Sequence, residues 1–172
     1  MGMKQNRHIQ VFESEHISFV KITESLLGDY LDMINDFENV GRFIGDRKEP
    51  FTEEQELEWV HEKVRDDGPY FSMIEKKTGD FIGNIEFMGV HDDTGELGIA
   101  ITASKQDKGF GKEAIRAMTG YGSNVLGLKR MVLKAYPDNS RAIHVYEECG
   151  FIEYDRNEKD VFMEYTGQGE AE

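Results

Sequence analysis

Short runs of alternating apolar and polar residues recur along the chain, which is the pattern of strands with one buried face. The first clear run covers residues 17–22, and residues 9–13 are a candidate for an extra strand before it. Runs at 70–76 and 81–91 flank the turn sequence Lys77-Thr78-Gly79-Asp80 and predict an antiparallel hairpin. Further strands are predicted at 96–102, 128–136, 151–155 and 161–165, with a tight turn at 92–95.

Four other segments place apolar residues at the spacing of an amphipathic helix. The first follows Thr23, and the second follows the capping box Thr52-Glu53-Glu54-Gln55. We expect Leu57, Val60 and Val64 to form the buried stripe of the second helix. The third lies between residues 110 and 126 and the fourth at 140–148. Strands and helices in this order predict an α+β fold, a mixed sheet with helices packed on it.

A glycine-rich loop joins the strand at 96–102 to the third helix. Its sequence is Gln106-Asp107-Lys108-Gly109-Phe110-Gly111-Lys112. Glycines let a backbone turn tightly and approach a ligand closely. The free N–H groups of the following helix start, with the positive end of the helix dipole behind them, favour a phosphate there. The stretch therefore predicts a site for a phosphate-containing ligand.

Two common nucleotide sites fit this loop poorly. Residues 109–114 match the dinucleotide pattern G-x-G-x-x-A, but residues 102–108 separate them from the strand, and the next strand contains no Asp or Glu for a ribose. A nucleotide P-loop needs Ser or Thr after Gly-Lys to hold magnesium, and here Glu113 follows. Coenzyme A and an ordinary loop with two glycines stay open at this point.

The pattern Gln-x-x-Gly-x-Gly between a strand and a helix resembles motif A of the GNAT N-acetyltransferases. Downstream, the chain is similar to the family's N-x-x-A-x-x-x-Y-x-x-x-G-F segment through Asn139, Ala142, Tyr146, Gly150 and Phe151. The resemblance runs from about residue 16 to residue 165. Within the family, the chain looks most like the branch of ribosomal-protein N-terminal acetyltransferases and bacterial spermidine acetyltransferases.

The resemblance implies a GNAT-like fold with a mostly antiparallel sheet and helices on both faces. The sheet would splay between the family's fourth and fifth strands, here 96–102 and 128–136, and acetyl-CoA would lie in the gap. Backbone N–H groups near Ile99 and Ile101 would bind the pantetheine and polarise the thioester carbonyl. The remaining implied cofactor-binding residues are Gln106, Lys108, Gly109, Phe110, Gly111, Lys112 and Asn139.

Amine acetylation needs a neutral amine, a polarised carbonyl and a proton for the leaving thiolate. Tyr146 matches the family's general acid, although a tyrosine on an amphipathic helix can also be a packing residue. Glu96 matches the glutamate that deprotonates the amine in several relatives. The alternative, that Glu96 is only a solvent-facing carboxylate at the start of a strand, is equally open. Glu86 and His91 are reserve candidates for the base. We expect Cys149 to be a buried small residue and not a nucleophile.

The composition narrows the class of protein. The length of 172 residues predicts one domain over 1–172, which the resemblance implies to be an acetyltransferase domain, with disorder expected at 1–8 and 167–172. A single cysteine excludes an internal disulfide, and no Cys/His cluster indicates a metal site. We see no signal peptide and no membrane span, so a reducing cytoplasm is the expected location. The oligomeric state stays open, a homodimer included.

Charge is distributed unevenly. The net charge of −14 argues against nucleic acid as a partner. Residues 104–136 hold seven bases and two acids, a net charge of +5 that suits a polyanionic cofactor. Residues 23–67 hold 14 acids and five bases, a net charge of −9. Because the resemblance places the acceptor beside this segment, we expect a cationic amine: a polyamine, an aminoglycoside or a peptide N-terminus.

The leading interpretation is acetyl transfer from acetyl-CoA to a primary amine, by direct attack in a ternary complex. A coenzyme A-binding module of the same fold without catalytic activity is the alternative. A nucleotide- or NAD-binding protein is a weaker one, for the reasons given above.

Overall fold

The computed structural model describes residues 8–45 and 48–167. The disorder expected at 1–8 and 167–172 therefore falls, except for residues 8 and 167, outside the described residues. The elements in chain order are β1 (Gln10–Glu13), β2 (Ile17–Lys21), η1 (Glu24–Leu26), α1 (Leu27–Asn35), η2 (Gly41–Phe43), α2 (Glu53–Asp66), β3 (Tyr70–Glu75), β4 (Phe81–His91), β5 (Thr94–Ile101), η3 (Ala103–Lys105), α3 (Phe110–Asn124), β6 (Arg130–Ala135), α4 (Ser140–Glu148), β7 (Phe151–Arg156) and β8 (Val161–Tyr165). All predicted strands and helices are present, including the extra first strand.

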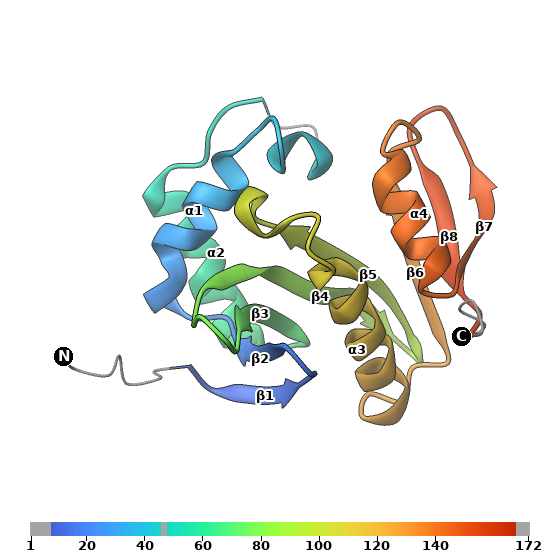
Figure 1. Cartoon of the computed structure of the whole chain (residues 1–172), viewed down its shortest axis with the longest axis horizontal. Helices are drawn as coiled ribbons and strands as arrows, with labels where there is room; N and C mark the ends of the chain where they lie inside the picture. Colours follow the sequence, from blue (N-terminus) through green and yellow to red (C-terminus); the bar gives the residue numbers. More distant parts are fainter. Residues whose placement is uncertain (1–7, 46–47, 168–172) are drawn as a thin grey trace. The chain divides into compact units, whose positions relative to one another are not determined.

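The strands form one mixed sheet in the order β1-β2-β3-β4-β5-β6-β8-β7 (Figure 1). Strand β5 pairs with β6 in parallel, whereas β1–β2, β2–β3, β6–β8 and β7–β8 are antiparallel. This confirms the predicted mostly antiparallel sheet with helices. The chain divides into two compact units, Met1–Asn84 with Ala100–Lys105, and Ile85–Ile99 with Gln106–Glu172. The expected single domain stays a prediction.

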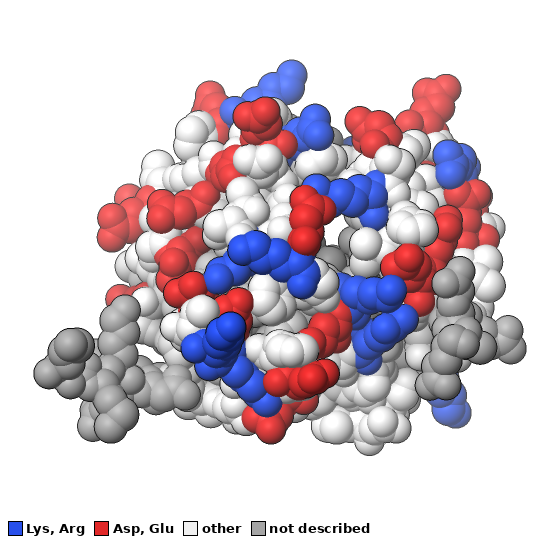
Figure 2. Space-filling view, in the orientation of Figure 1, with Lys and Arg blue, Asp and Glu red and all other residues white. Residues whose placement is uncertain are grey.

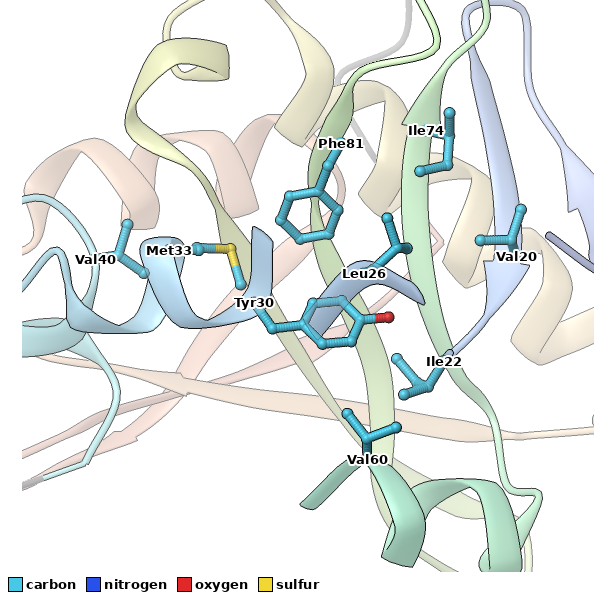
Figure 3. Packing of buried hydrophobic residues seen from close by; sticks show 9 residues of the cluster. All are labelled: Val20, Ile22, Leu26, Tyr30, Met33, Val40, Val60, Ile74 and Phe81. Carbon is cyan, nitrogen blue, oxygen red and sulfur yellow. The ribbon is translucent and has the colours of Figure 1, made fainter. Parts of the chain in front are cut away.

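The first unit has a core formed by α1, α2 and the strands beside them (Figure 3). Tyr30 lies in this cluster, with its ring centroid 5.6 Å from those of both Trp59 and Phe81. Its hydroxyl lies 2.6 Å from Ser72 Oγ, and Ser72 Oγ donates to Asn84 Oδ1 at 2.8 Å. Because the one Ser72 proton goes to Asn84, the Tyr30 hydroxyl must donate to Ser72. Burial raises the pKa of Tyr30 to about 12.

Helix α2 begins at the predicted capping box. The Thr52 side chain accepts from the Gln55 N–H, and the Gln55 side chain accepts from the Thr52 N–H. The prediction that Val64 belongs to the buried stripe is wrong, because this residue is 54% exposed. Val60 and Glu56 are the buried residues of the helix. Val64 lies one turn after Val60, close to the helix end at Asp66, and so extends past the cluster that Val60 enters.

In the second unit, α3 buries an apolar face made of Ala114, Ile115 and Met118. Gly122 belongs to the same face, and a Cβ there would lie 2.8 Å from Met131 Sδ and 2.9 Å from the Phe87 ring. The helix can therefore pack closely on the strands only with glycine at this position. Helix α4 packs against β7, which forms an antiparallel pair with β8.

Strands β5 and β6 pair only at their beginnings. Thr94, Gly95 and Glu96 face Arg130, Met131 and Val132, yet β5 continues to Ile101 and β6 to Ala135. Figure 1 shows the two strands diverging beyond this point. The predicted splay is confirmed, with β5 beginning at Thr94 and not at residue 96. The turn before it has only two residues, Asp92 and Asp93, with Asp92 at φ 51°.

Candidate cofactor and catalytic site

Two carboxylates lie on one face of the sheet near the point where β5 and β6 part. Glu96 is half-buried and occupies the last paired position of β5. Strand alternation puts Gly98 on the same face as Glu96. A Cβ at Gly98 would lie 3.6 Å from Glu86 Oε1, which places the carboxylate of Glu86 over the same face. Glu96 and Glu86 are therefore both candidates for a base beside the splay.

The third candidate base lies elsewhere. His91 is at the hairpin turn, where its side chain is 86% exposed and its Nε2 is 3.3 Å from Asp92 Oδ2. His91 is the last residue of β4, whereas Glu96 and Glu86 share the strand face beside the splay, and the role of His91 as a reserve base stays a prediction.

Beyond Glu96, β5 has no hydrogen-bonded pairing with β6. Ile99 lies in this unpaired stretch, where N–H groups on the β6 side of the strand can bind an extended ligand. Ile101 falls in the segment Ala100–Lys105 of the other unit. Both residues belong to the single strand β5, and the binding of pantetheine by their N–H groups stays a prediction.

The glycine loop has the geometry of a helix-start anion site. Asp107 and Gly109 have φ values of 60° and 86°, and α3 begins directly after, at Phe110. Among the described residues, no hydrogen bond is made by the N–H groups of Phe110, Gly111 or Lys112. Such unpaired donors at a helix start, backed by the helix dipole, are suited to phosphate.

The loop is braced by the start of α4. Arg141 Nη2 donates to Gln106 Oε1 at 2.9 Å, and Arg141 Nη1 is 3.3 Å from Asp107 Oδ2. Asn139 caps α4, since its Oδ1 accepts from the Ala142 N–H at 3.3 Å. The capping role expected of Asn139 is confirmed, and a cofactor contact by it stays a prediction. Sequence reasoning missed Arg141, because its partners lie 34 and 35 residues away with no local pattern between them.

Tyr146 lies on α4 with its ring centroid 6.3 Å from that of Phe151. It is half-buried, and its hydroxyl makes no hydrogen bond to any other described residue. Burial, together with the nearby Cys149 thiol, raises the pKa of Tyr146 to about 12. At neutral pH the side chain is therefore a protonated phenol with a free donor. Cys149 is buried, and burial raises the pKa of its thiol, which agrees with the expected packing role.

The basic segment is less positive in space than its sequence predicts. On the face drawn in Figure 2, acidic side chains lie beside many of the basic ones. Four of the seven bases form ion pairs with acids from outside residues 104–136: Lys105 with Asp80 at 2.9 Å, Lys112 with Glu148 at 2.9 Å, Arg130 with Glu164 at 2.8 Å and Lys129 with Asp93 at 3.8 Å. Lys105 also belongs to the first unit. A cofactor bound at the glycine loop would therefore rely more on backbone N–H groups than the count of +5 indicates.

Glu148 is a second residue that the sequence reasoning missed. Its two carboxylate oxygens lie 2.9 Å from Lys112 Nζ and 2.9 Å from His144 Nε2. The hydrogen bond from Lys112 lowers the pKa of Glu148 against the opposing effect of burial. The four-residue spacing of His144 and Glu148 on one helix is the signal that could have indicated part of this cluster.

Within residues 8–45 and 48–167, no group of three or more His, Cys, Asp or Glu side chains is placed to hold a metal ion. Of the helices in these same ranges, none combines the length and the apolar character needed to cross a membrane.

Known proteins with similar sequences are N-acetyltransferases by name. A spermidine N(1)-acetyltransferase of Vibrio cholerae is 29% identical over 119 residues, which are 67% of this chain and 69% of that protein. An uncharacterized N-acetyltransferase of Bacillus subtilis is 30% identical over 103 residues, 58% of this chain and 59% of that protein.

Solved structures share the fold. A GNAT-family acetyltransferase from Bacillus anthracis superposes with a TM-score of 0.78 at 20% identity, over 88% of this chain and 95% of that one. Spermidine N-acetyltransferase from Vibrio cholerae, in complex with CoA and spermine, gives 0.74 at 19% identity, over 88% and 94%. The model of the acetyltransferase (GNAT) domain matches residues 16–152. The chain therefore belongs to the GNAT family of N-acetyltransferases.

Proposed function

We propose that the protein transfers the acetyl group of acetyl-CoA to a primary amine of a cationic small molecule or peptide N-terminus. The observation that carries the proposal is the parting of β5 and β6 in the same unit as the glycine loop and Tyr146. An unpaired strand edge suits the pantetheine arm of acetyl-CoA, unpaired helix-start N–H groups suit its pyrophosphate, and a free phenol donor suits its leaving thiolate.

In the proposed reaction both substrates are bound together. The amine nitrogen attacks the thioester carbonyl carbon, and the new C–N bond forms as the C–S bond breaks. The proton lost by the amine goes to Glu96, directly or through water. The thiolate that leaves takes the proton of Tyr146, which water then restores. N–H groups of β5 near Ile99 would polarise the carbonyl, while Gln106, Asn139 and the loop amides of residues 108–112 would hold the cofactor.

A polyamine is the acceptor class with the most support. Two observations favour it: relatives named spermidine N(1)-acetyltransferase, and the net charge of −9 over residues 23–67. Not all of these acids are available to a ligand, since Glu56 is buried and Asp67 is paired with Lys21 at 3.0 Å. Aminoglycosides and peptide N-termini carry the same kind of charge and belong in the same test. The single buried cysteine suits the reducing cytoplasm that we expect for this enzyme.

The test has two stages. A thermal-shift panel of acetyl-CoA, NAD and ATP identifies the cofactor, because a ligand at 100 times its dissociation constant stabilises the fold by about 2.7 kcal/mol. Release of free CoA thiol is then measured with polyamines, aminoglycosides, short peptides and neutral amines. Acetyl-CoA binding without thiol release for any amine would favour the non-catalytic module. Stabilisation by NAD or ATP alone would overturn the proposal.

A further inference from the structure

Helix α4 carries Tyr146 and is held only in part by packing. None of its nine residues is fully buried, although Cys149 and Phe151 just after it are. Hydrophobic stabilisation scales with the apolar area removed from water, so a helix with half-buried side chains gains less from it than one with fully buried side chains. Polar contacts therefore add to the packing of α4 on β7 in holding the helix, and with it the Tyr146 hydroxyl that lacks a partner of its own among the described residues.

Those contacts converge on Glu148, at the last residue of α4. Lys112 Nζ, from the first turn of α3, lies 2.9 Å from one of its carboxylate oxygens, and His144 Nε2 lies 2.9 Å from the other. The side chains of Lys112 and Glu148 are 38% and 28% exposed, so this ion pair is partly shielded from solvent. Charge-assisted hydrogen bonds to both oxygens fix the direction of a carboxylate better than one contact does.

Two further contacts join the same two helix ends. Arg116 Nη2 donates to the backbone oxygen of Glu148 at 3.5 Å, and Cys149 Sγ donates to the backbone oxygen of Lys112 at 3.7 Å. The turn of α3 that offers unpaired N–H groups to a phosphate is thus linked directly to the turn of α4 that follows Tyr146. Tyr146 is only two residues from Glu148.

We propose that Lys112 and Glu148 are positioning residues, whose ion pair, with His144 on the second oxygen, holds Tyr146 in place relative to the cofactor loop. We call these three side chains the clamp. The inference rests on the proposed function, because it takes Tyr146 as the acid. In this proposal Lys112 has two roles. Its backbone N–H binds the cofactor phosphate, and its ammonium group holds α4.

The variant Glu148→Gln keeps the shape of the side chain and removes the charge. We expect kcat to fall about 10-fold, since a shift of an acid by 1 Å can cost as much as roughly 10²-fold. The KM for acetyl-CoA should change less than about twofold, because the loop N–H groups stay intact. Glu147→Gln is the matched control, with the same change of charge on the same helix. The Glu147 side chain forms no ion pair within the described part of the chain, and its variant should keep the wild-type kcat.

A double-mutant cycle separates the ion pair from two unrelated effects. Lys112→Met should lower kcat about as much as Glu148→Gln, by about 10-fold, and the double variant should be no worse than either single variant. If the two losses in kcat multiply in the double variant, or if Glu148→Gln has the wild-type kcat, the clamp does not position Tyr146.

Amide hydrogen exchange over residues 140–148 tests the clamp without any assay of activity. Exchange should become faster in Glu148→Gln and stay unchanged in Glu147→Gln. Unchanged exchange in Glu148→Gln would overturn the proposal even for an active enzyme. Faster exchange in a protein that acetylates no amine would keep the structural link between α3 and α4 and overturn the assignment of Tyr146 as the acid.

Discussion

Glu96 faces Val132 at the last position where the parallel strands β5 and β6 pair. One residue further along, the pairing has ended, so the carboxylate of Glu96 lies on the strand just where the backbone becomes available to a ligand. This location favours Glu96 as the base that receives the amine proton.

The variant Glu96→Gln should therefore lower kcat/KM for the best amine by roughly 10²-fold or more, the usual cost of losing a general base. Glu86→Gln removes the neighbouring carboxylate on the same face and should cost much less. Steady-state kinetics of both variants, with acetyl-CoA saturating, decides between them. A larger loss for Glu86→Gln would assign the base to Glu86.

Tyr146→Phe removes only a hydroxyl that has no protein partner in the described structure. We expect unchanged thermal stability and acetyl-CoA affinity, with kcat lowered about 10²–10⁴-fold because the thiolate loses its proton donor. Tyr165→Phe is the control, since the Tyr165 ring also packs near Phe151, with 5.4 Å between the two ring centroids. Wild-type kcat in Tyr146→Phe, with product release shown not to limit the rate, would make Tyr146 a packing residue.

Gly109 adopts φ 86° with no heavy atom within 4 Å of the position of a Cβ. The cost of a side chain there is thus one of backbone conformation, about 1–3 kcal/mol for a β-branched residue. Gly109→Val should weaken the binding of acetyl-CoA, because relief of the strain turns the loop N–H groups away from the phosphate. The affinity is measured by isothermal titration calorimetry. Gly109→Asn should retain more affinity, since Asn tolerates this conformation. Gly120→Ala, also in open space but within α3, should leave affinity unchanged.

Alkaline pH should destabilise the fold through its buried tyrosines. Burial raises the pKa of Tyr30 to about 12, whereas an unfolded tyrosine ionises near pH 10. The stabilisation is thus complete below pH 10 and is lost as pH rises towards 12, by roughly 2–3 kcal/mol for this group. Urea denaturation at pH 8–12 should show the loss, and it should shrink in Tyr30→Phe. That variant should be less stable at pH 7, because Ser72 and the Thr23 N–H lose a partner.

If the acceptor is a cationic amine, kcat/KM for it should depend on the salt concentration. Attraction by the 14 acids of residues 23–67 would raise kcat/KM for a polyamine at low ionic strength, and added salt would screen it. A neutral primary amine of similar size is the control and should show no salt dependence. If the neutral amine is the better substrate and salt affects neither, the acids only keep two surface helices hydrated, and the acceptor is uncharged or anionic.

Local patterns predicted the elements well, because strands and helices follow from the period of the apolar residues. The capping box at Thr52 and the loop before α3 are local features, and both were confirmed in the structure. The end of the buried stripe was missed at Val64, since how far the core reaches along a helix depends on residues distant in the sequence.

Long-range ion pairs were out of reach of the sequence. Lys105 is 25 residues from Asp80, and Lys112 is 36 residues from Glu148, so their charges were counted as available to a cofactor. Only the tertiary structure shows that these bases are already paired. Gly109 and Tyr146 could be singled out because each lies in a short pattern. Arg141 lies in none that indicates its contacts with Gln106 and Asp107, and only the four-residue spacing to His144 indicates part of the cluster around Glu148.

The parting of β5 and β6 also has a cost for the protein without its ligand. Unpaired strand edges are templates on which other chains add strands, and proteins usually blunt them at the margins of a sheet with charges or bulges. Here the unpaired edge lies within the sheet, where a charge or a bulge would block the proposed site. A bound cofactor would occupy this edge, so it should protect the protein against aggregation as well as serve as acetyl donor.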